Sequence, residues 1–385
     1  MNGSLDKSPE IKRQEIKGWC PGAYRPMASG DGLVVRVRPW MGEVSSAQAL
    51  ALCDLAERFG SGTLELTSRA NLQIRGIEEA DHGAVIAMLL EAGLLDADPS
   101  LEGRRNLVMT PDWQPGDETH QLAKALLHAL PSLPDVPAKF GYAVDTGAER
   151  WVAEAPADIR FERGHRGGLI IVADGADGGM PVTVDTGQEA LTALLAWFVD
   201  TGGRASGRMA RHLAQTHLPP EWTQVPRSAS KRTINCTLGT LIGVPFGQID
   251  TRALRALLAD NTLKMLRVLP GRTLLAKRSS QHIPEGFSPP DDPVLNVHAC
   301  TGAPGCPQAL GPTRALARTL AKTLPDGESL HVSGCAKGCA HPRAADRTYV
   351  ATQSGFDLVS KGAPWDAPEA RGLSADAILD RPQQR

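Results

Sequence analysis

Alternating apolar and polar positions predict the first ordered elements of this chain. In residues 33–40, LVVRVRPW, valines alternate with arginines, which is typical of a strand with one polar face. The next segment, AQALALCDLAERFG, has an apolar face at helical spacing; Ser45 or Ser46 can cap this helix and Gly60 can end it. Residues 63–76, TLELTSRANLQIRG, predict a further strand, and EADHGAVIAMLLEAGL predicts a further helix. The pattern therefore predicts a strand–helix–strand–helix unit.

A similar pattern returns in the second half of the chain. Residues 244–261, VPFGQIDTRALRALLADN, repeat the order seen in VRPWMGEVSSAQALALCDLAERFG: a strand, Pro, Gly, and a capped helix with a Leu/Ala face. The segment LPGRTLLAK then corresponds loosely to LELTSRANLQI, with Arg272 opposite Arg69 and Leu274 opposite Asn71. We interpret this as a duplication with diverged halves; two unrelated α/β units are the alternative.

Composition narrows the classes of partner. The 385 residues carry a formal net charge of −2, so no bulk attraction to nucleic acid or to an anionic membrane is expected. An anionic ligand would have to meet a local basic patch. No apolar run approaches the roughly 20 residues that span a bilayer, and the polar amino terminus lacks a signal sequence. We therefore expect a cytoplasmic protein with reduced cysteines.

Four of the seven cysteines form two close pairs, Cys300 with Cys306 and Cys335 with Cys339. Thiolates are soft ligands that suit zinc or an iron–sulfur cluster. Structural zinc sites usually space paired ligands two to four residues apart, whereas the first pair here has five intervening residues, rich in Gly and Pro. The spacing favours a 4Fe–4S cluster. Zinc and unrelated free thiols remain the alternatives.

Two predicted strands carry polar faces rich in arginine. One face holds Arg36 and Arg38, and the other holds Arg69, Asn71, Gln73 and Arg75. A polar strand face is commonly just solvated. Two such faces together favour a floor that binds carboxylates or phosphates, because guanidinium groups bind these anions through paired hydrogen bonds.

The pattern C-x5-C…C-x3-C resembles the cluster signature of the sulfite and nitrite reductase haemoprotein family. The resemblance implies that the last cysteine, Cys339, also bridges the cluster to the iron of sirohaem. In that family an R-x-N-x-Q strand binds the carboxylates of sirohaem, and Arg69, Asn71 and Gln73 match it position by position. It further implies catalytic roles for Arg38, Arg105 and Lys139, and tetrapyrrole binding by Arg36, Arg38, Arg69, Asn71, Gln73, Arg105 and Lys139.

One departure from that family concerns the substrate anion. Sulfite and nitrite reductases carry a K-F-K segment whose two lysines hold the substrate. Here Lys139 matches the first lysine, but Gly141 replaces the second. Losing a cation weakens a site for a small dianion. Gly141 is expected instead to leave room for a larger ligand.

The chain also resembles a narrower branch of the family, the precorrin-3B synthases of aerobic cobalamin biosynthesis. CPGAYRPMASGDGLVVRVRP, LTSRANLQIRG, KFGYAVDTG and CTGAPGC carry this resemblance, which spans about residues 18–350. It implies a monooxygenase that converts precorrin-3A to precorrin-3B by meso-carbon hydroxylation and lactone formation. Dioxygen would be a co-substrate and NADH the ultimate reductant. A separate reductase would deliver the electrons.

Several expectations stay open at this point. The branch is associated with a non-haem iron, and His298, His331 and His341 lie near the cluster motifs, but no spacing singles out ligands. Cys20, in GWCPG, belongs either to an arm that folds over the macrocycle or to a mobile tail. The alternative functions are a sirohaem-dependent sulfite or nitrite reductase, an electron-transfer or tetrapyrrole carrier without turnover, and a zinc-stabilised binding module.

The resemblance implies an α+β fold with a duplicated sulfite/nitrite reductase-like architecture. Two ferredoxin-like half-repeats would pair, accompanied by α/β domains that bind the cluster and the tetrapyrrole. The expected boundaries are an amino-terminal arm (1–30), the first half-repeat (31–95), a tetrapyrrole-contacting α/β domain (96–217), a linker (218–233), the second half-repeat (234–290), the 4Fe–4S-binding α/β domain (291–360) and a carboxy-terminal tail (361–385).

Overall fold

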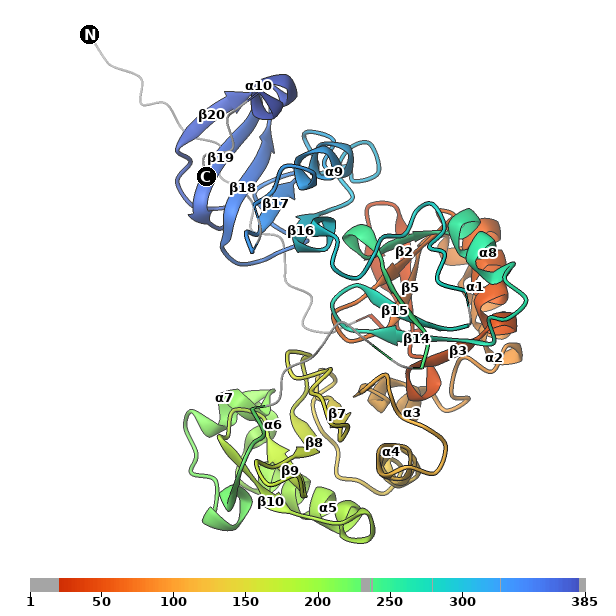
Figure 1. Cartoon of the computed structure of the whole chain (residues 1–385), viewed down its shortest axis with the longest axis vertical. Coiled ribbons are helices and arrows are strands. Elements are labelled where there is room, and N and C mark those ends of the chain that lie inside the picture. The colour runs from red at the N-terminus through yellow and green to blue at the C-terminus, as the bar shows by residue number, and fades with distance from the viewer. Residues whose placement is uncertain (1–20, 230–235, 237, 279, 326, 381–385) are drawn as a thin grey trace.

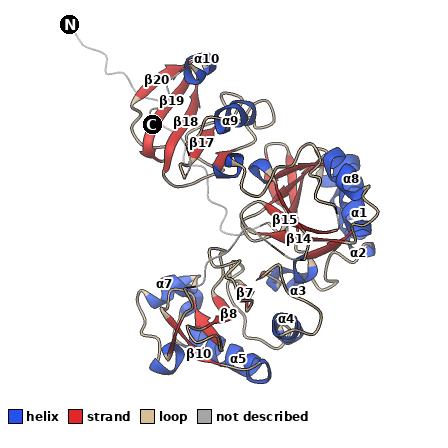
Figure 2. Ribbon diagram, viewed as in Figure 1, coloured by secondary structure: helices blue, strands red, loops and turns tan. Residues whose placement is uncertain are grey.

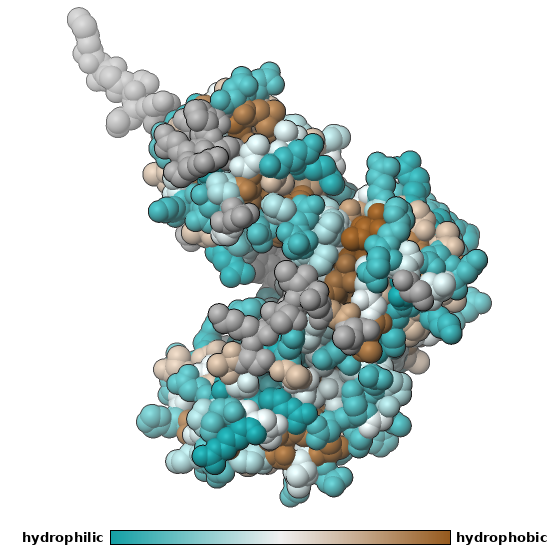
Figure 3. Space-filling view, in the orientation of Figure 1, coloured by the Kyte–Doolittle hydropathy of each residue, from teal (hydrophilic) through white to brown (hydrophobic). Residues whose placement is uncertain are grey.

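The computed structural model of the chain describes residues 21–229, 236, 238–278, 280–325 and 327–380. Figure 1 shows three lobes in an open arrangement, with a central lobe that meets two outer lobes. The space-filling view in Figure 3 shows a mostly hydrophilic face that is hollowed between the two outer lobes. Each lobe has its own hydrophobic core. The sheets, together with the helices that pack on them, make the fold α+β, as predicted.

The central lobe holds two sheets that share one core. The first has the strand order β1-β2-β5-β4-β13: β1 Met27–Ser29, β2 Gly32–Val37, β5 Leu72–Ile77, β4 Thr63–Leu66 and β13 Gln248–Asp250. The second has the order β12-β15-β14-β3: β12 Thr240–Gly243, β15 Thr273–Lys277, β14 Met265–Leu269 and β3 Glu43–Ser45. Helices α1 (Ser46–Phe59), α2 (His82–Glu91) and α8 (Thr251–Leu258) lie together on one side of these strands (Figure 2).

Each half of the duplication gives one strand to the sheet of the other half. Strand β13, from the second half, pairs with β4 of the first, with Ile249 opposite Leu64. Strand β3, from the first half, pairs with β14 of the second, with Val44 opposite Leu266. The two halves are therefore interlocked by backbone hydrogen bonds as well as by a common core.

Helix α1 begins and ends where the sequence predicts. The Ser45 side chain accepts a hydrogen bond from Gln48 N at 3.1 Å, and the Gln48 side chain accepts one from Ser45 N at 3.0 Å. This reciprocal cap satisfies two amide groups that the first turn leaves without helical partners. Gly60 is the carboxy-terminal cap. The buried face of the helix includes Leu52 and Leu55.

The prediction of one strand over residues 63–76 is wrong, because the segment is a hairpin of β4 and β5. Thr67 N donates to Asn71 O at 2.9 Å, and Asn71 N donates to Thr67 Oγ1 at 3.1 Å. Ala70 has a φ of 53° and completes the turn. Arg69 therefore lies on the turn, whereas Gln73 stays on the strand.

The hairpins also correct the register of the duplication. Ala70 and Arg272 are the non-glycine residues with positive φ in the two hairpin turns, at 53° and 60°. Each lies two residues before a leucine: Leu72 pairs with Val37 of β2, and Leu274 pairs with Ile242 of β12. Arg272 is thus equivalent to Ala70, one position away from the Arg69 pairing that the sequence suggested.

One outer lobe is a six-stranded sheet with the order β11-β10-β9-β8-β7-β6: β11 Val225–Pro226, β10 Gly178–Pro181, β9 Leu169–Ala173, β8 Ile159–Arg163, β7 Tyr142–Asp145 and β6 Leu107–Met109. Its helices are α3 Pro99–Arg104, α4 Glu118–Ala129, α5 Val184–Asp200, α6 Gly203–Ser206 and α7 Met209–Leu213. Part of the expected linker belongs to this lobe, since β11 pairs with β10; residues 230–233 lie outside the described residues.

The other outer lobe is a five-stranded sheet with the order β16-β17-β18-β19-β20: β16 Val297–Ala299, β17 Leu330–Ser333, β18 Ala345–Thr352, β19 Gly355–Gly362 and β20 Ala370–Leu373. Its helices are α9 Arg314–Ala321 and α10 Ala375–Leu379. Residues 361–380 are therefore part of the sheet and its core, not a separate tail, because β20 pairs with β19 and Ile378 is buried.

Two more sequence expectations concern the amino terminus and membranes. Residues 27–29 of the expected arm form β1, which pairs antiparallel with β2. Cys20 lies outside the described residues. Among the helices that the structure describes, none combines the length and the apolarity that crossing a bilayer would need.

The interlocked strands generate a stability prediction. Ile249 is 2% exposed and packs in the central core, so Ile249→Ala removes buried apolar volume at the exchange strand. We expect the free energy of unfolding to fall by about 3 kcal/mol, measured from the unfolding transition of the central lobe in a urea titration. Leu50→Ala, at an exposed position of α1, is the control and should cost less than about 1 kcal/mol. Equal losses in both variants would contradict the packing described.

Candidate functional site

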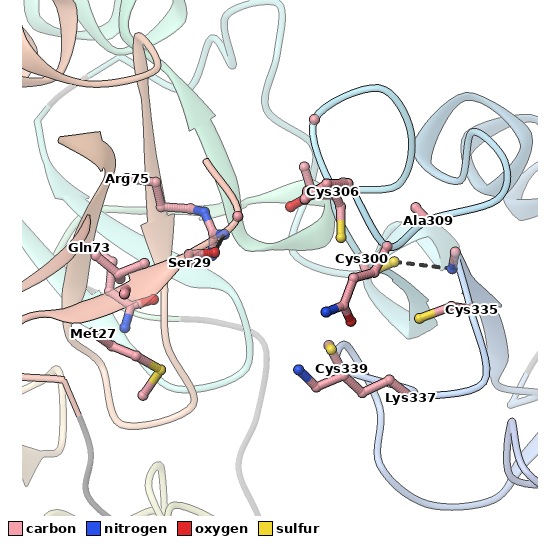
Figure 4. Close-up of a pocket in the computed structure, with 18 of the residues that line it drawn as sticks. Met27, Ser29, Gln73, Arg75, Cys300, Cys306, Ala309, Cys335, Lys337 and Cys339 are labelled. Carbon is pink, nitrogen blue, oxygen red and sulfur yellow. Dashed lines mark hydrogen bonds between the residues drawn. The ribbon is translucent and has the colours of Figure 1, made fainter. Parts of the chain in front are cut away.

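A cavity of about 760 Å³ lies between the central lobe and the lobe of β16–β20 (Figure 4). One wall comes from β1, β2 and β5, and the other comes from the loops that carry the paired cysteines. The first wall includes Met27, Ser29, Arg36, Gln73 and Arg75, and the second includes Cys300, Cys306, Cys335, Lys337 and Cys339. The structure thus brings all four predicted cysteines to one cavity, opposite three of the polar strand residues.

The topology of the sheet explains why the two cysteine pairs meet. Cys300 follows β16 directly, and Cys335 follows β17 after one residue. These strands are parallel neighbours, so their carboxyl ends lie at the same edge of the sheet. Gly334 N donates to Cys300 Sγ at 3.2 Å. A Cβ at Gly334 would lie 3.3 Å from that sulfur and 2.8 Å from Ala309 Cβ, so glycine permits this approach.

The second cysteine loop has a fixed backbone. Ser333 Oγ donates to Cys335 O at 2.7 Å. Gly338 adopts a φ of 65°, a conformation that favours glycine. Burial raises the pKa of the Cys339 thiol, and the positive charge of Lys337 acts in the opposite direction.

The donor set fits an iron–sulfur cluster better than a single ion. In the described part of the chain, no three His, Cys, Asp or Glu side chains converge closely enough to hold one metal ion. The four thiols instead line one wall of a cavity, with a backbone N–H already directed at one sulfur. Four thiolates and such N–H groups are what Fe–S clusters use.

The guanidinium groups of Arg36 and Arg75 on the basic wall are bound to neighbouring side chains. Arg75 donates to both oxygens of Asp31 at 3.0 Å and lies 3.4 Å from Glu65 Oε2. With the Gln73 amide oxygen turned toward Arg36, Arg36 donates to it at 2.9 and 3.2 Å. Arg75 is therefore positioned by two carboxylates, and Arg36 contacts the amide of Gln73.

The predicted residues Arg38 and Arg105 form a buried network that does not line the cavity. Arg38 Nη1 lies 3.3 Å from Glu102 Oε1, and Arg105 donates to Glu102 Oε2 at 2.5 and 3.1 Å. Arg38 Nε also donates to Asn106 Oδ1 at 3.1 Å, and the Arg105 guanidinium stacks 3.7 Å from the ring centroid of Trp40. Burial lowers the pKa of Arg38 to about 10, although Glu102 opposes this shift.

The remaining predicted residues lie away from the lining of the cavity. Lys139 is exposed, Arg69 is half-buried on the hairpin turn, and Asn71 is buried with Nδ2 lacking a hydrogen bond. Gly141 does not create room, contrary to the expectation from the sequence. It is buried, its N donates to Asp158 Oδ2 at 2.9 Å, and a Cβ there would lie 3.2 Å from a backbone carbonyl.

The three histidines near the cluster motifs form a group with Arg272. The rings of His298 and His341 are 3.9 Å apart, and those of His331 and His341 are 5.8 Å apart. Arg272 contacts His298 Nδ1 and donates to Val297 O at 2.5 Å. Burial lowers the pKa of His298 to about 2 and of His331 to about 4, with the neighbouring positive charges acting in the same direction. A guanidinium beside these rings disfavours a further cation, so we assign no iron ligands here.

Sequence reasoning missed several residues that shape the site. Glu102 carried a signal, because an acidic residue three positions before Arg105 shares a helical face with it. Lys337 also carried one, as a cation between two candidate ligands. Met27 and Ser29 gave no signal, since only the pairing of β1 with β2 brings them to the cavity.

This architecture is similar to that of known proteins. Residues 25–92 match the nitrite/sulfite reductase ferredoxin-like half domain. The solved structure of the Mycobacterium tuberculosis NirA protein has a similar fold, with a TM-score of 0.61 at 19% identity over 90% of this chain and 79% of that one. A ferredoxin–nitrite reductase of Leptolyngbya laminosa is 23% identical, over 88% of this chain and 80% of its own length. The chain therefore shares its overall fold with the NirA protein and contains a nitrite/sulfite reductase ferredoxin-like half domain.

A second relative specifies the family. The precorrin-3B synthase of Sinorhizobium sp is 30% identical, with 92% of this chain and 85% of the relative aligned. The chain belongs to the precorrin-3B synthase family.

The buried network generates a stability prediction. Glu102→Gln removes the carboxylate shared by two arginines that are each 4% exposed. Removing one partner of a buried ion pair leaves uncompensated charge, so the free energy of unfolding should fall by about 3 kcal/mol in a denaturant titration. Glu91→Gln, at the exposed end of α2, should change it by less than about 0.5 kcal/mol. A Glu102→Gln protein as stable as the unsubstituted chain would show that the carboxylate does not hold the network.

Proposed function

We propose that this chain is a precorrin-3B synthase, an oxidoreductase of aerobic cobalamin biosynthesis. It would convert precorrin-3A to precorrin-3B by hydroxylating a meso carbon and closing a lactone. Membership of the family supports this activity. The main support for this activity is the cavity of about 760 Å³. One of its walls is the basic strand wall, and four cysteines line the other.

The basic wall suits a tetrapyrrole that carries many carboxylates. Arg36 and Gln73 offer N–H donors from neighbouring strands, at positions that are paired in register. Guanidinium groups bind carboxylates through two parallel hydrogen bonds, which orients the ligand as well as holding it. Asp31 and Glu65 keep Arg75 in place beside them. The cavity volume lies within the range usual for small-molecule sites.

The opposite wall would hold a 4Fe–4S cluster on Cys300, Cys306, Cys335 and Cys339. When bound, such a cluster supplies electrons one at a time, which the reduction of dioxygen requires. Gly334 N–H, directed at Cys300 Sγ, would stabilise the charge on that sulfur. We propose NADH as the ultimate reductant, acting through a separate reductase. A non-haem iron, expected from the family resemblance, is left without assigned ligands.

The second candidate is a sirohaem-dependent sulfite or nitrite reductase, which the fold likeness favours. In that case the tetrapyrrole would be a resident group. The Arg38 and Arg105 pair argues against it, because both charges are directed at Glu102 and neither residue lines the cavity.

Turnover with isotopically labelled dioxygen tests the proposal directly. The protein, purified anaerobically and reduced, is mixed with precorrin-3A and ¹⁸O₂, and the products are analysed by mass spectrometry. We expect precorrin-3B with one ¹⁸O atom, the other atom leaving as water with two electrons from the reductant. Consumption of nitrite or sulfite without tetrapyrrole conversion would support the second candidate. Tetrapyrrole binding without conversion would support a carrier.

The cluster assignment predicts the effect of single cysteine substitutions. Replacing any one of the four cavity cysteines by serine should lower bound iron and sulfide and the broad visible absorption by at least several-fold, because the donor is lost. Cys53→Ala is the matched control, since Cys53 is buried in the central core away from the cavity, and it should retain iron. Full iron and sulfide in both Cys300→Ser and Cys339→Ser would exclude the assigned ligands. Zinc in place of iron would favour the binding module.

A further inference from the structure

Strand β1 supplies a part of the cavity wall to which the proposed function assigns no role. Met27, Ala28 and Ser29 of this strand line the cavity, together with Pro21 and Gly30 on either side of it. All five residues belong to the segment CPGAYRPMASGDG, which carries part of the resemblance to the precorrin-3B synthases. Figure 4 shows the Met27 side chain directed from β1 into the space between the two walls. Its thioether can therefore contact a ligand that fills the cavity.

The strand wall is divided into an apolar part and a polar part. Met27 on β1 lies opposite Val34 on β2, and both line the cavity. Val34 and Arg36 are two residues apart on β2, so their side chains share one face of the sheet. Arg36 in turn lies opposite Gln73 of β5, which also lines the cavity. The Met27–Val34 pair is therefore beside the Arg36–Gln73 pair on one wall.

Contacts on both sides of β1 fix the position of Met27. Before the strand, Arg36 N donates to Gly22 O at 3.2 Å, which ties this part of the segment to β2. After the strand, a Cβ at Gly30 would collide with the ring of Pro307, so the Gly30 backbone packs directly against the loop of the first cysteine pair. Met27 itself is half-buried, so its side chain is partly enclosed and keeps apolar surface that a ligand can cover.

A tetrapyrrole has a complementary division of its own surface. Its carboxylates lie at the periphery, whereas the two faces of its ring are apolar. Removing apolar surface from water stabilises a complex, and a thioether makes further favourable contacts with aromatic rings. Hydrogen bonds to a flexible peripheral carboxylate hold the ligand but leave its ring free to tilt. An apolar contact beside them would fix the ring plane.

From this arrangement we infer that Met27 is a positioning residue whose thioether packs, with Val34, against one face of the tetrapyrrole ring. The inference rests on the proposed function. The contact holds the ring plane while the Arg36–Gln73 pair binds a peripheral carboxylate. Because Met27 and the four cysteines lie on opposite walls, the other face of the ring is turned toward the cysteines. Met27 thus determines how the macrocycle is presented to the cysteine wall.

The first test measures ligand affinity rather than turnover. The iron-loaded full chain and its Met27 variants are titrated with uroporphyrin III, a tetrapyrrole with eight carboxylates, and quenching of its fluorescence gives the dissociation constant. Met27→Ala should weaken binding roughly fivefold, because part of the apolar contact is lost. Met27→Leu should restore most of the affinity, whereas Met27→Gln, which is similar in length but polar, should not. Met265→Ala changes a half-buried methionine of the same lobe that does not line the cavity, and it should leave the affinity unchanged.

Methyl NMR gives a second readout, which a purely structural role of Met27 would not move. In protein labelled with [methyl-¹³C]methionine, the Met27 signal is identified by its absence from the spectrum of Met27→Leu. Uroporphyrin III should shift this signal upfield, because the ring current of an aromatic macrocycle shields nuclei that lie over its face. The signal of Met265 should keep its position. This experiment uses the unsubstituted side chain, so it applies even if Met27→Ala does not retain iron.

The outcomes separate this inference from the proposed function. If the unsubstituted protein binds uroporphyrin III and the Ala and Gln variants bind it equally well, the inference is wrong and the tetrapyrrole site stands. A Met27 signal that stays in place or moves downfield in the complex would also overturn it, as would a Leu variant that binds as weakly as the Ala variant. If the unsubstituted protein binds neither uroporphyrin III nor precorrin-3A, the proposed function and the inference both fail.

Discussion

The reciprocal exchange of β3 and β13 is the constraint on which the rest of the structure depends. Because each sheet of the central lobe is completed by a strand of the other half, neither half can shift without breaking backbone pairing. Strand β13 extends the sheet at β4, and β5 pairs directly with both β4 and β2 in that sheet. Arg36 and Gln73 lie opposite each other on β2 and β5, and both line the cavity.

Contacts between lobes then set the width of the cavity. The backbone at Gly30 approaches the ring of Pro307, Arg314 lies 3.3 Å from Glu65, and Arg272 donates to Val297 O at 2.5 Å. Each contact joins the central lobe to the lobe of the cysteines. The cavity is thus a junction between two lobes, and its two walls carry different chemistry: hydrogen-bonding cations on one side and soft thiol donors on the other.

The sequence predicted well those features that depend on local rules. Capping at Ser45 and the spacing of the cysteine pairs are local patterns, and the structure has both the helix and the convergent loops. The hairpin at Thr67–Asn71 was missed, because Ala70 at positive φ has no signal comparable to that of glycine. The network around Glu102 was missed because its partner Arg38 is 64 residues away, and such pairing depends on the tertiary fold. For the same reason Arg38 and Arg105, expected at the site, lie in a buried network instead.

We propose that the basic wall receives the tetrapyrrole as a substrate and not as a permanent group. An absorption spectrum of the anaerobically purified protein, with iron, sulfide and sirohaem quantified per chain, tests this most directly. We expect broad iron–sulfur absorption without sirohaem bands, and an affinity for added precorrin-3A. Stoichiometric sirohaem in the isolated protein would contradict it, because the wall assigned to the substrate would already be occupied.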